Sequence, residues 1–284
     1  MLGRDEAILE GWTTLSALGG ATHRAQLGMI HQSHYFRSAA ITAKMSATLD
    51  HLTGGRFVLF YDYGQQVREN RAYHLPYPED VEQRVAETVD GARLIRDLWM
   101  ADKPVTVSHG KSGVTGATCM PLPVTAPPIW FGEVHPGLLA ACAEFGNGWN
   151  TTPCSVADLR RRLGLLEGAC AAVGRDPGEI ETSIELQVLI APEGEVSSTL
   201  ATILEKAPDA DQVVSDLGEF AAGRSVELPG SLTNSTLVGT PDQVIEQVRA
   251  YVDAGVDHFM LWFLDAPDRR GMDLFAQEVA PRFR

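Results

Sequence analysis

The sequence lacks several features that would assign a class of protein at once. No run of about 18 apolar residues could span a bilayer, and the start MLGRDEAILE has neither the basic residues nor the apolar stretch of a signal peptide. Lys and Arg are scarce, 23 against 37 Asp plus Glu, and the net charge of −14 repels nucleic-acid phosphates and anionic lipid. We therefore expect no nucleic acid and no membrane as partner, and a cytoplasmic location.

Cysteines and short catalytic motifs are also few. The four cysteines Cys119, Cys142, Cys154 and Cys170 have no CxxC spacing, which argues against zinc and a disulfide framework and favours small buried side chains. HExxH, P-loop and GxSxG patterns are absent. We expect no metal site.

A run of apolar residues between Arg56 and Gly64 is the clearest structural signal. Phe57–Tyr61 do not alternate with polar residues, which is typical of a strand buried on both faces of a parallel sheet. The preceding segment 39–52 is predicted to be a helix that ends at Gly54 and packs through one apolar stripe. That stripe comprises Ile41, Met45, Leu49 and Leu52.

The same alternation of helix and strand recurs along the chain. Strands are predicted at 26–31, 129–132, 149–152, 181–191 and 258–263, and those at 129–132 and 258–263 are expected to be buried. Helices are predicted at 10–22, 81–99, 138–145, 155–173 and 240–255. About six parallel strands alternating with helices predict an incomplete TIM (β/α)8-type barrel. The length allows one such domain or two smaller ones, and without a Pro/Ser-rich linker we expect a single domain over 1–284.

One long segment interrupts this alternation. Residues 102–125 are rich in Gly, Ser, Thr and Pro, which predicts a surface excursion with short hairpin strands. Loops of this length in a compact domain often cover a ligand, so the excursion is interpreted as a lid.

Three blocks in order resemble a known family. They are LGMIHQSHYFRSAAITAKMSATLDHLTGGRFVLFYDYG, PPIWFGEVHPGLLAACAEFGNGWNTTP and TLVGTPDQVIEQVRAYVDAGVDHFMLWF. Together they resemble the bacterial luciferase-like monooxygenases, which are flavin- or coenzyme F420-dependent oxidoreductases on a TIM barrel, and the resemblance covers residues 10–265. That family normally begins with a strand, a helix and a second strand that ends near a catalytic histidine. This N-terminal segment is missing here, so that histidine cannot be transferred to any residue.

The carboxyl ends of barrel strands carry the working residues, and this rule selects the candidate site. A histidine there can move a proton near neutral pH, and glycine allows close approach to a ring. Gly132–Gly137 opens a helix whose N-terminus suits a phosphate, provided that the Glu133 carboxylate points away, binds a ribityl hydroxyl, or the phosphate lies elsewhere, near Thr152. The predicted catalytic residues are His31 and His34, and the predicted cofactor-binding residues are Gln32, Ser33, Asp62, Tyr63, Gly64, Gly132, Glu133, His135 and Thr152.

The resemblance implies an FMN- or F420-dependent oxidoreductase or monooxygenase that acts on a small organic substrate. It further implies a non-proline cis peptide, expected at Ile30–His31, and a homodimer formed through the helices at 10–22 and 39–52. With FMN, a flavin reductase would supply the reduced cofactor. The alternative is a catalytically reduced or inactive relative that serves as a binding or assembly protein, favoured by the missing front, which would expose two sheet edges.

Overall fold

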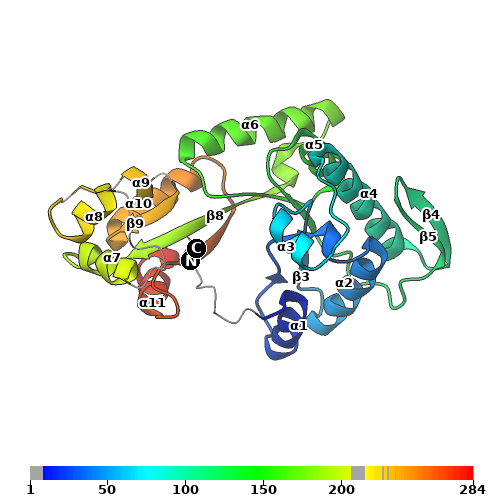
Figure 1. Ribbon diagram of the computed structural model, residues 1–284, viewed down its shortest axis with the longest axis horizontal. Helices are drawn as coiled ribbons and strands as arrows, with labels where there is room; N and C mark the ends of the chain where they lie inside the picture. Colours follow the sequence, from blue (N-terminus) through cyan, green and yellow to red (C-terminus); the bar gives the residue numbers. More distant parts are fainter. Residues whose placement is uncertain (1–8, 206–214, 226, 229, 234, 284) are drawn as a thin grey trace. The chain divides into compact units, whose positions relative to one another are not determined.

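The computed structural model describes residues 9–205, 215–225, 227–228, 230–233 and 235–283. These residues form two compact units, whose elements are labelled in Figure 1. The N-terminal unit comprises Ile8–Trp149 and Leu165–Ile180, and the C-terminal unit includes Asn150–Gly164 and Glu181–Arg284. Two elements, β7 (Gly148–Thr151) and α6 (Val156–Val173), contribute residues to both units. The expectation of a single domain stays a prediction.

The N-terminal unit is organised around β3 (Phe57–Asp62), all six residues of which are buried, as its apolar run predicts. β1 (Leu27–Gly28) and β2 (Gln32–Ser33) pair with it on one side, and the order continues through β6 (Ile129–Gly132) to β7. The pairings of β3 with β1, β2 and β6 are parallel.

The predicted strand at 26–31 is instead two short strands. Gly28 pairs with Val58 and Gln32 with Tyr61, so the chain takes four steps (32 − 28) opposite three steps of β3 (61 − 58). The extra residue lifts this segment off β3, as a β-bulge does. The peptide bond between Ile30 and His31 within it is cis, as the family resemblance predicts.

The helices of this unit are α1 (Gly11–Ala21), α2 (Ala39–Thr53), α3 (Val67–Ala72), α4 (Val81–Met100) and α5 (Pro136–Phe145). The stripe predicted for α2 is wrong, because Ile41 and Leu52 are 54% and 56% exposed. Close packing against α4 requires small side chains, and α2 buries such a face instead. That face comprises Ala39, Thr42, Ala43, Ser46, Ala47 and Asp50.

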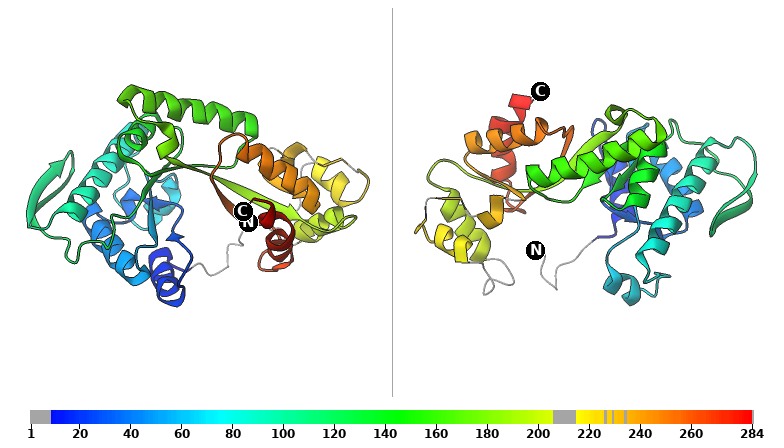
Figure 2. Two further views of the ribbon diagram at one scale, coloured as in Figure 1. Left: turned by 180° about the vertical axis from the view of Figure 1, so that it is seen from behind. Right: turned by 90° about the horizontal axis from the view of Figure 1, so that it is seen from above.

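The segment 102–125 contains the predicted hairpin, formed by antiparallel β4 (Val105–His109) and β5 (Ser112–Ala117). It lies against the outer side of α4 in every view (Figure 2). His109 pairs with Asp97 at 2.6 Å and Lys111 with Glu87 at 2.6 Å, which anchors the hairpin to that helix. Its interpretation as a lid stays a prediction.

The C-terminal unit is built on β8 (Glu181–Ile190), which runs parallel to β9 (Thr236–Gly239) and β10 (His258–Phe263). The sheet order continues as β7-β8-β10, so the predicted strands are neighbours in the order in which they occur along the chain. The strand β9, which pairs with β8, was not predicted. β10 is only partly buried, with Trp262 63% exposed, and the prediction of a fully buried strand is wrong. The helices are α7 (Val196–Glu205), α8 (Ser215–Ala221), α9 (Gly230–Thr233), α10 (Pro241–Val252) and α11 (Arg270–Leu274).

The four cysteines are buried free thiols, as predicted from their scattered spacing. Burial raises the pKa of the Cys142 thiol to about 12, so this group stays protonated and unreactive at neutral pH. Among the described helices, none has both the length and the apolar character needed to cross a bilayer.

Candidate functional site

The carboxyl ends of β2, β3 and β6 lie at one edge of the sheet of the N-terminal unit, because these strands are parallel neighbours. Ser33 is in register with Asp62, so the two strands end together. The next residues, Tyr63 and Gly64 after β3 and Glu133 after β6, extend this edge. We call it the carboxyl edge, and it contains most of the residues that the sequence selects.

His31 and Asp62 form the charged centre of the carboxyl edge. His31 Nδ1 lies 3.2 Å from Asp62 Oδ2, and the two side chains are 28% and 7% exposed. A buried carboxylate is stable only when it is paired or hydrogen-bonded, and here His31 supplies the partner. The structure therefore brings together one predicted catalytic residue and one predicted cofactor-binding residue.

Both the N–H and the carbonyl of Gly64 are held by hydrogen bonds. Its N–H donates to Asp62 Oδ1 at 2.7 Å, and its carbonyl accepts the hydroxyl of Tyr77 at 2.7 Å. Its φ of 66° lies in the left-handed region, and a Cβ added there would be 2.5 Å from Ser33 Oγ. Glycine is thus required both by the backbone conformation and by the close approach of Ser33.

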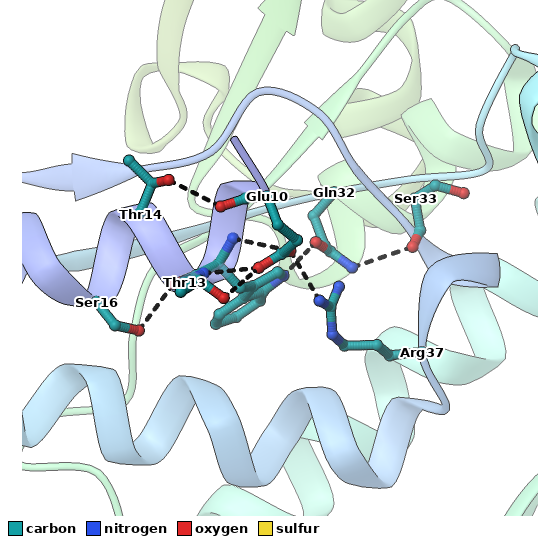
Figure 3. Close-up of polar contacts among 8 residues, drawn as sticks. Glu10, Thr13, Thr14, Ser16, Gln32, Ser33 and Arg37 are labelled. Carbon is teal, nitrogen blue, oxygen red and sulfur yellow. Dashed lines mark hydrogen bonds and ion pairs between the residues drawn. The ribbon is translucent and has the colours of Figure 1, made fainter. Parts of the chain in front are cut away.

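Gln32, a predicted cofactor-binding residue, is hydrogen-bonded within the protein. Its side chain is buried, accepts a hydrogen bond from the Trp12 indole, and donates to the Ser33 carbonyl at 3.1 Å (Figure 3). These bonds fix β2 to the start of α1. The amide is therefore engaged by the protein, and Trp12 is a residue that sequence reasoning missed.

A second contact joins the chain after β2 to the start of α1. Glu10 caps the helix by accepting the N–H groups of Trp12 and Thr13, and it also binds Arg37 at 2.9 Å (Figure 3). Burial raises the pKa of Glu10, but the hydrogen bonds from Thr13, Trp12 and Arg37 outweigh it and lower the pKa to about 2. The Glu10 carboxylate is therefore ionised at all physiological pH values.

Glu133 and His135 follow β6, where the sequence predicts a phosphate site after Gly132. The Glu133 carboxylate accepts a hydrogen bond from Gln65 at 3.0 Å, and its carbonyl accepts the Trp149 indole at 2.8 Å. Glu133 has a φ of 71°, unusual for a residue with a side chain. Its carboxylate is thus directed to the segment that follows Gly64.

His135 caps α5. Its Nδ1 accepts the Gly137 N–H at 3.2 Å and its Nε2 lies 3.0 Å from Glu82. Because Nδ1 is an acceptor, the proton resides on Nε2 and is directed to that carboxylate. The Gly137 N–H, one of the donors that a phosphate at the start of α5 would need, is therefore already hydrogen-bonded.

His34 is not brought to the carboxyl edge. Its Nδ1 lies 2.7 Å from the Tyr61 hydroxyl, and the ring packs against Gly91 of α4, where an added Cβ would be 2.6 Å from Nδ1. Burial lowers the pKa of His34, and the carboxylates of Glu87 and Asp90 oppose this shift. His34 therefore lies on the helix-covered side of β3, apart from His31.

Thr152 belongs to the C-terminal unit. Arg162 Nη1 donates a hydrogen bond to Thr152 Oγ1 at 3.1 Å and another to Thr151 Oγ1 at 2.5 Å. Arg162 was not predicted, because its position in the middle of α6 carries no sequence signal for a ligand. A guanidinium beside two hydroxyls has the donors that bind an anion.

The C-terminal unit also has a half-open cavity of about 340 Å³ at the ends of β8 and β10. Its lining includes Ile190, Pro192, Asp265, Arg270 and Gln277. Within the part of the chain that the structure describes, no group of three or more His, Cys, Asp or Glu side chains could hold a metal ion.

Comparisons with known proteins agree with this architecture. The family model for luciferase-like monooxygenases matches residues 2–258. The F420-dependent glucose-6-phosphate dehydrogenase of Rhodococcus erythropolis is 27% identical over 278 residues, which covers 95% of this chain and 82% of the relative. The corresponding enzyme of Nocardia farcinica is 26% identical over 279 residues, with the same shares covered.

Solved structures share the fold. An F420-dependent secondary alcohol dehydrogenase in complex with an F420–acetone adduct matches with a TM-score of 0.80 and 21% identity, covering 99% of this chain and 86% of that one. A long-chain alkane monooxygenase matches with a TM-score of 0.76 and 15% identity, covering 97% and 73%. These likenesses establish the TIM-barrel type of fold that the sequence predicts.

Replacing Gly64 by Ala tests the contact between β2 and β3. Left-handed backbone costs an L-residue about 1–2 kcal/mol, and the clash with Ser33 adds to it, so we expect a loss of at least about 2–3 kcal/mol in the free energy of unfolding. Gly54 has the same φ of 66° with open space around it, so Gly54→Ala is the matched control and should lose only the backbone cost of about 1–2 kcal/mol. Equal losses in chemical denaturation of the two variants would contradict the close approach.

The lowered pKa of His34 predicts a pH-dependent stability. Between its folded pKa and the ordinary value near 6.5, the unfolded chain binds a proton that the folded protein excludes, so stability rises with pH in this window. We expect the free energy of unfolding to fall from about pH 7.5 to 5.5, and less steeply in His34→Asn. The control is His23→Asn, at an exposed histidine. An unchanged slope in His34→Asn would contradict the assignment.

Proposed function

The chain belongs to the luciferase-like monooxygenase family, and on that premise we propose that it is an oxidoreductase that binds F420 or FMN at the carboxyl edge of β2, β3 and β6. The observation that carries the proposal is the His31–Asp62 pair, which lies where parallel strands end and is hydrogen-bonded to the Gly64 N–H. Enzymes on barrels of parallel strands act at this edge.

The residues of the carboxyl edge fit a planar heteroaromatic ring. Gly64 presents backbone without a side chain, Ser33 adds a hydroxyl beside it, and Tyr63 adds a half-buried aromatic ring next to His135. When bound, F420 supplies hydride transfer, whereas reduced FMN supplies oxygen activation. The protein contributes binding, orientation and proton handling.

His31 is the group that we assign to proton transfer. Asp62 holds its Nδ1, which fixes the orientation of the imidazole and stabilises the charge that a proton brings. His34, which the sequence also selects, has Tyr61 and Gly91 as neighbours and is better suited to stabilising the packing of β3 against α4. A small organic substrate would therefore exchange its proton with His31.

The named relatives favour F420 over FMN. The curated relatives described above are F420-dependent dehydrogenases, and one structure with the same fold is an F420-dependent secondary alcohol dehydrogenase. We infer that hydride transfer with a hydroxyl-bearing substrate is the preferred reaction. FMN with a separate reductase is the second form of the proposal, supported by the fold of the alkane monooxygenase.

We propose Thr152 and Arg162 as an anion-binding group within the C-terminal unit, and we consider Gly132–Gly137 poorly suited to a phosphate. Arg162 supplies a charged donor, while the loop after β6 directs a carboxylate, Glu133, along the carboxyl edge. A phosphate beside that carboxylate would be repelled. Thr152 therefore keeps its role as a proposed ligand-binding residue.

We propose a homodimer formed through α1 and α2. Ile41 and Leu52 of α2 are exposed apolar residues, and so are Met120 and Val124. The segment that contains Met120 and Val124 is held against α2 by two hydrogen bonds, from Lys44 Nζ to the Met120 carbonyl and from the Val124 N–H to Asp50. Exposed apolar surface of this kind is typical of protein interfaces.

We also infer a cytoplasmic location, supported by the free thiols and testable by cell fractionation.

Titration with F420 and with FMN tests the proposed function. We expect saturable binding of one cofactor, followed by fluorescence, and a loss of roughly 3- to 10-fold in affinity for Tyr63→Ala, because an aromatic stack contributes about 0.5–1.5 kcal/mol. The control Tyr73→Ala removes a ring that is 72% exposed and should bind normally. Absence of saturable binding of either cofactor would instead support the binding or assembly protein.

Sedimentation velocity tests the dimer. Ile41→Glu places a charge in the apolar patch and should shift the protein from dimer towards monomer, because an unpaired charge at an interface is costly. Val173→Glu alters a residue that is 52% exposed on α6 and should leave the assembly unchanged. A monomeric wild type, or equal effects of both variants, would refute the proposed interface.

A further inference from the structure

A buried arginine stands next to the carboxyl edge. Arg84, in α4, is 6% exposed, and its Nη1 donates to the carbonyls of Pro78 at 2.8 Å and Glu79 at 2.9 Å. None of the ion pairs found among the described residues includes it. A buried cation near the positive end of a helix is unfavourable unless other groups stabilise it.

Two tyrosine rings supply that stabilisation. The guanidinium carbon of Arg84 lies 4.6 Å from the ring centre of Tyr77 and 5.7 Å from that of Tyr63. Its Nε is buried and has no hydrogen-bond acceptor among the described residues. The planar group is thus held mainly by aromatic faces and by the two carbonyls, and it fixes both rings in return.

The two rings flank Gly64, which connects Arg84 to the proposed catalytic pair. The Tyr77 hydroxyl donates to the Gly64 carbonyl, the Gly64 N–H donates to Asp62 Oδ1, and Asp62 Oδ2 holds His31 Nδ1. A shift of the Tyr77 ring would therefore move the Gly64 peptide and, with it, the carboxylate that orients His31.

We propose that Arg84 is a positioning residue, which sets the orientation of His31 through Tyr77, Gly64 and Asp62. The importance of that orientation for catalysis rests on the proposed function, whereas the orientation itself is a property of the protein without cofactor. Arginine is required here because its planar group lies against two rings while its Nη1 donates to two carbonyls, whereas a lysine ammonium has no flat face to lie against the rings.

The tautomer of His31 provides the test, measured by ¹⁵N NMR of the imidazole in the cofactor-free protein. Asp62 accepts from Nδ1, so the Nδ1–H tautomer should predominate in the wild type. We expect Arg84→Lys to lower the ratio of the Nδ1–H to the Nε2–H tautomer by about threefold or more, a coupling typical of residues in one network. Tyr77→Phe should lower it similarly, and the double variant should add little.

Arg71→Lys is the matched control, since Arg71 lies in the neighbouring α3, pairs with Glu79 and is exposed. It should leave the tautomer ratio as in the wild type. If Arg84 only packs, Arg84→Lys and Tyr77→Phe will lower the melting temperature and leave the ratio unchanged, which would overturn the proposal. Tyr77→Phe, which deletes one hydroxyl, decides the matter if Arg84→Lys does not fold. A protein that binds no cofactor would refute the proposed function and leave this result unaffected.

Discussion

The carboxylate of Asp62 is the constraint on which the carboxyl edge depends. One of its oxygens fixes the Gly64 N–H and the other holds His31, so a single buried charge connects β3, the turn that follows it and the bulged segment before β2. Such a charge is stable only while its partners remain in place. The close packing of Ser33 on Gly64 and the bond from Tyr77 maintain them, and this gives the edge a defined shape.

Local sequence signals predicted the frame of this edge well. The apolar run Phe57–Tyr61 identified a strand buried on both faces, and Asp62 and Gly64 were selected because they follow it directly. The cis peptide at Ile30–His31 was predicted from the family resemblance alone, since no local pattern in the sequence indicates one. The hairpin at 105–117 followed from its turn-forming composition.

The errors arise where neighbours distant in sequence decide the outcome. Gln32 is hydrogen-bonded to Trp12 and His34 packs on α4, contacts that no local pattern in the sequence indicates, and their predicted roles stay predictions. The apolar stripe of α2 was misplaced because close packing on α4 selects small residues, which a hydrophobic pattern does not reveal. At His135, Nδ1 caps α5 and Nε2 contacts Glu82 of α4, contacts that no local sequence pattern indicates, and its role in cofactor binding stays a prediction.

The most direct test of the account is a map of backbone amide shifts in ¹⁵N-labelled protein during titration with F420 and, separately, FMN. The account predicts saturable shifts at Ser33, Tyr63 and Gly64, at the carboxyl ends of β2 and β3, and no change at Phe57 and Ile129, where β3 and β6 begin. Shifts confined to the beginnings of these strands, or scattered without saturation, would contradict it.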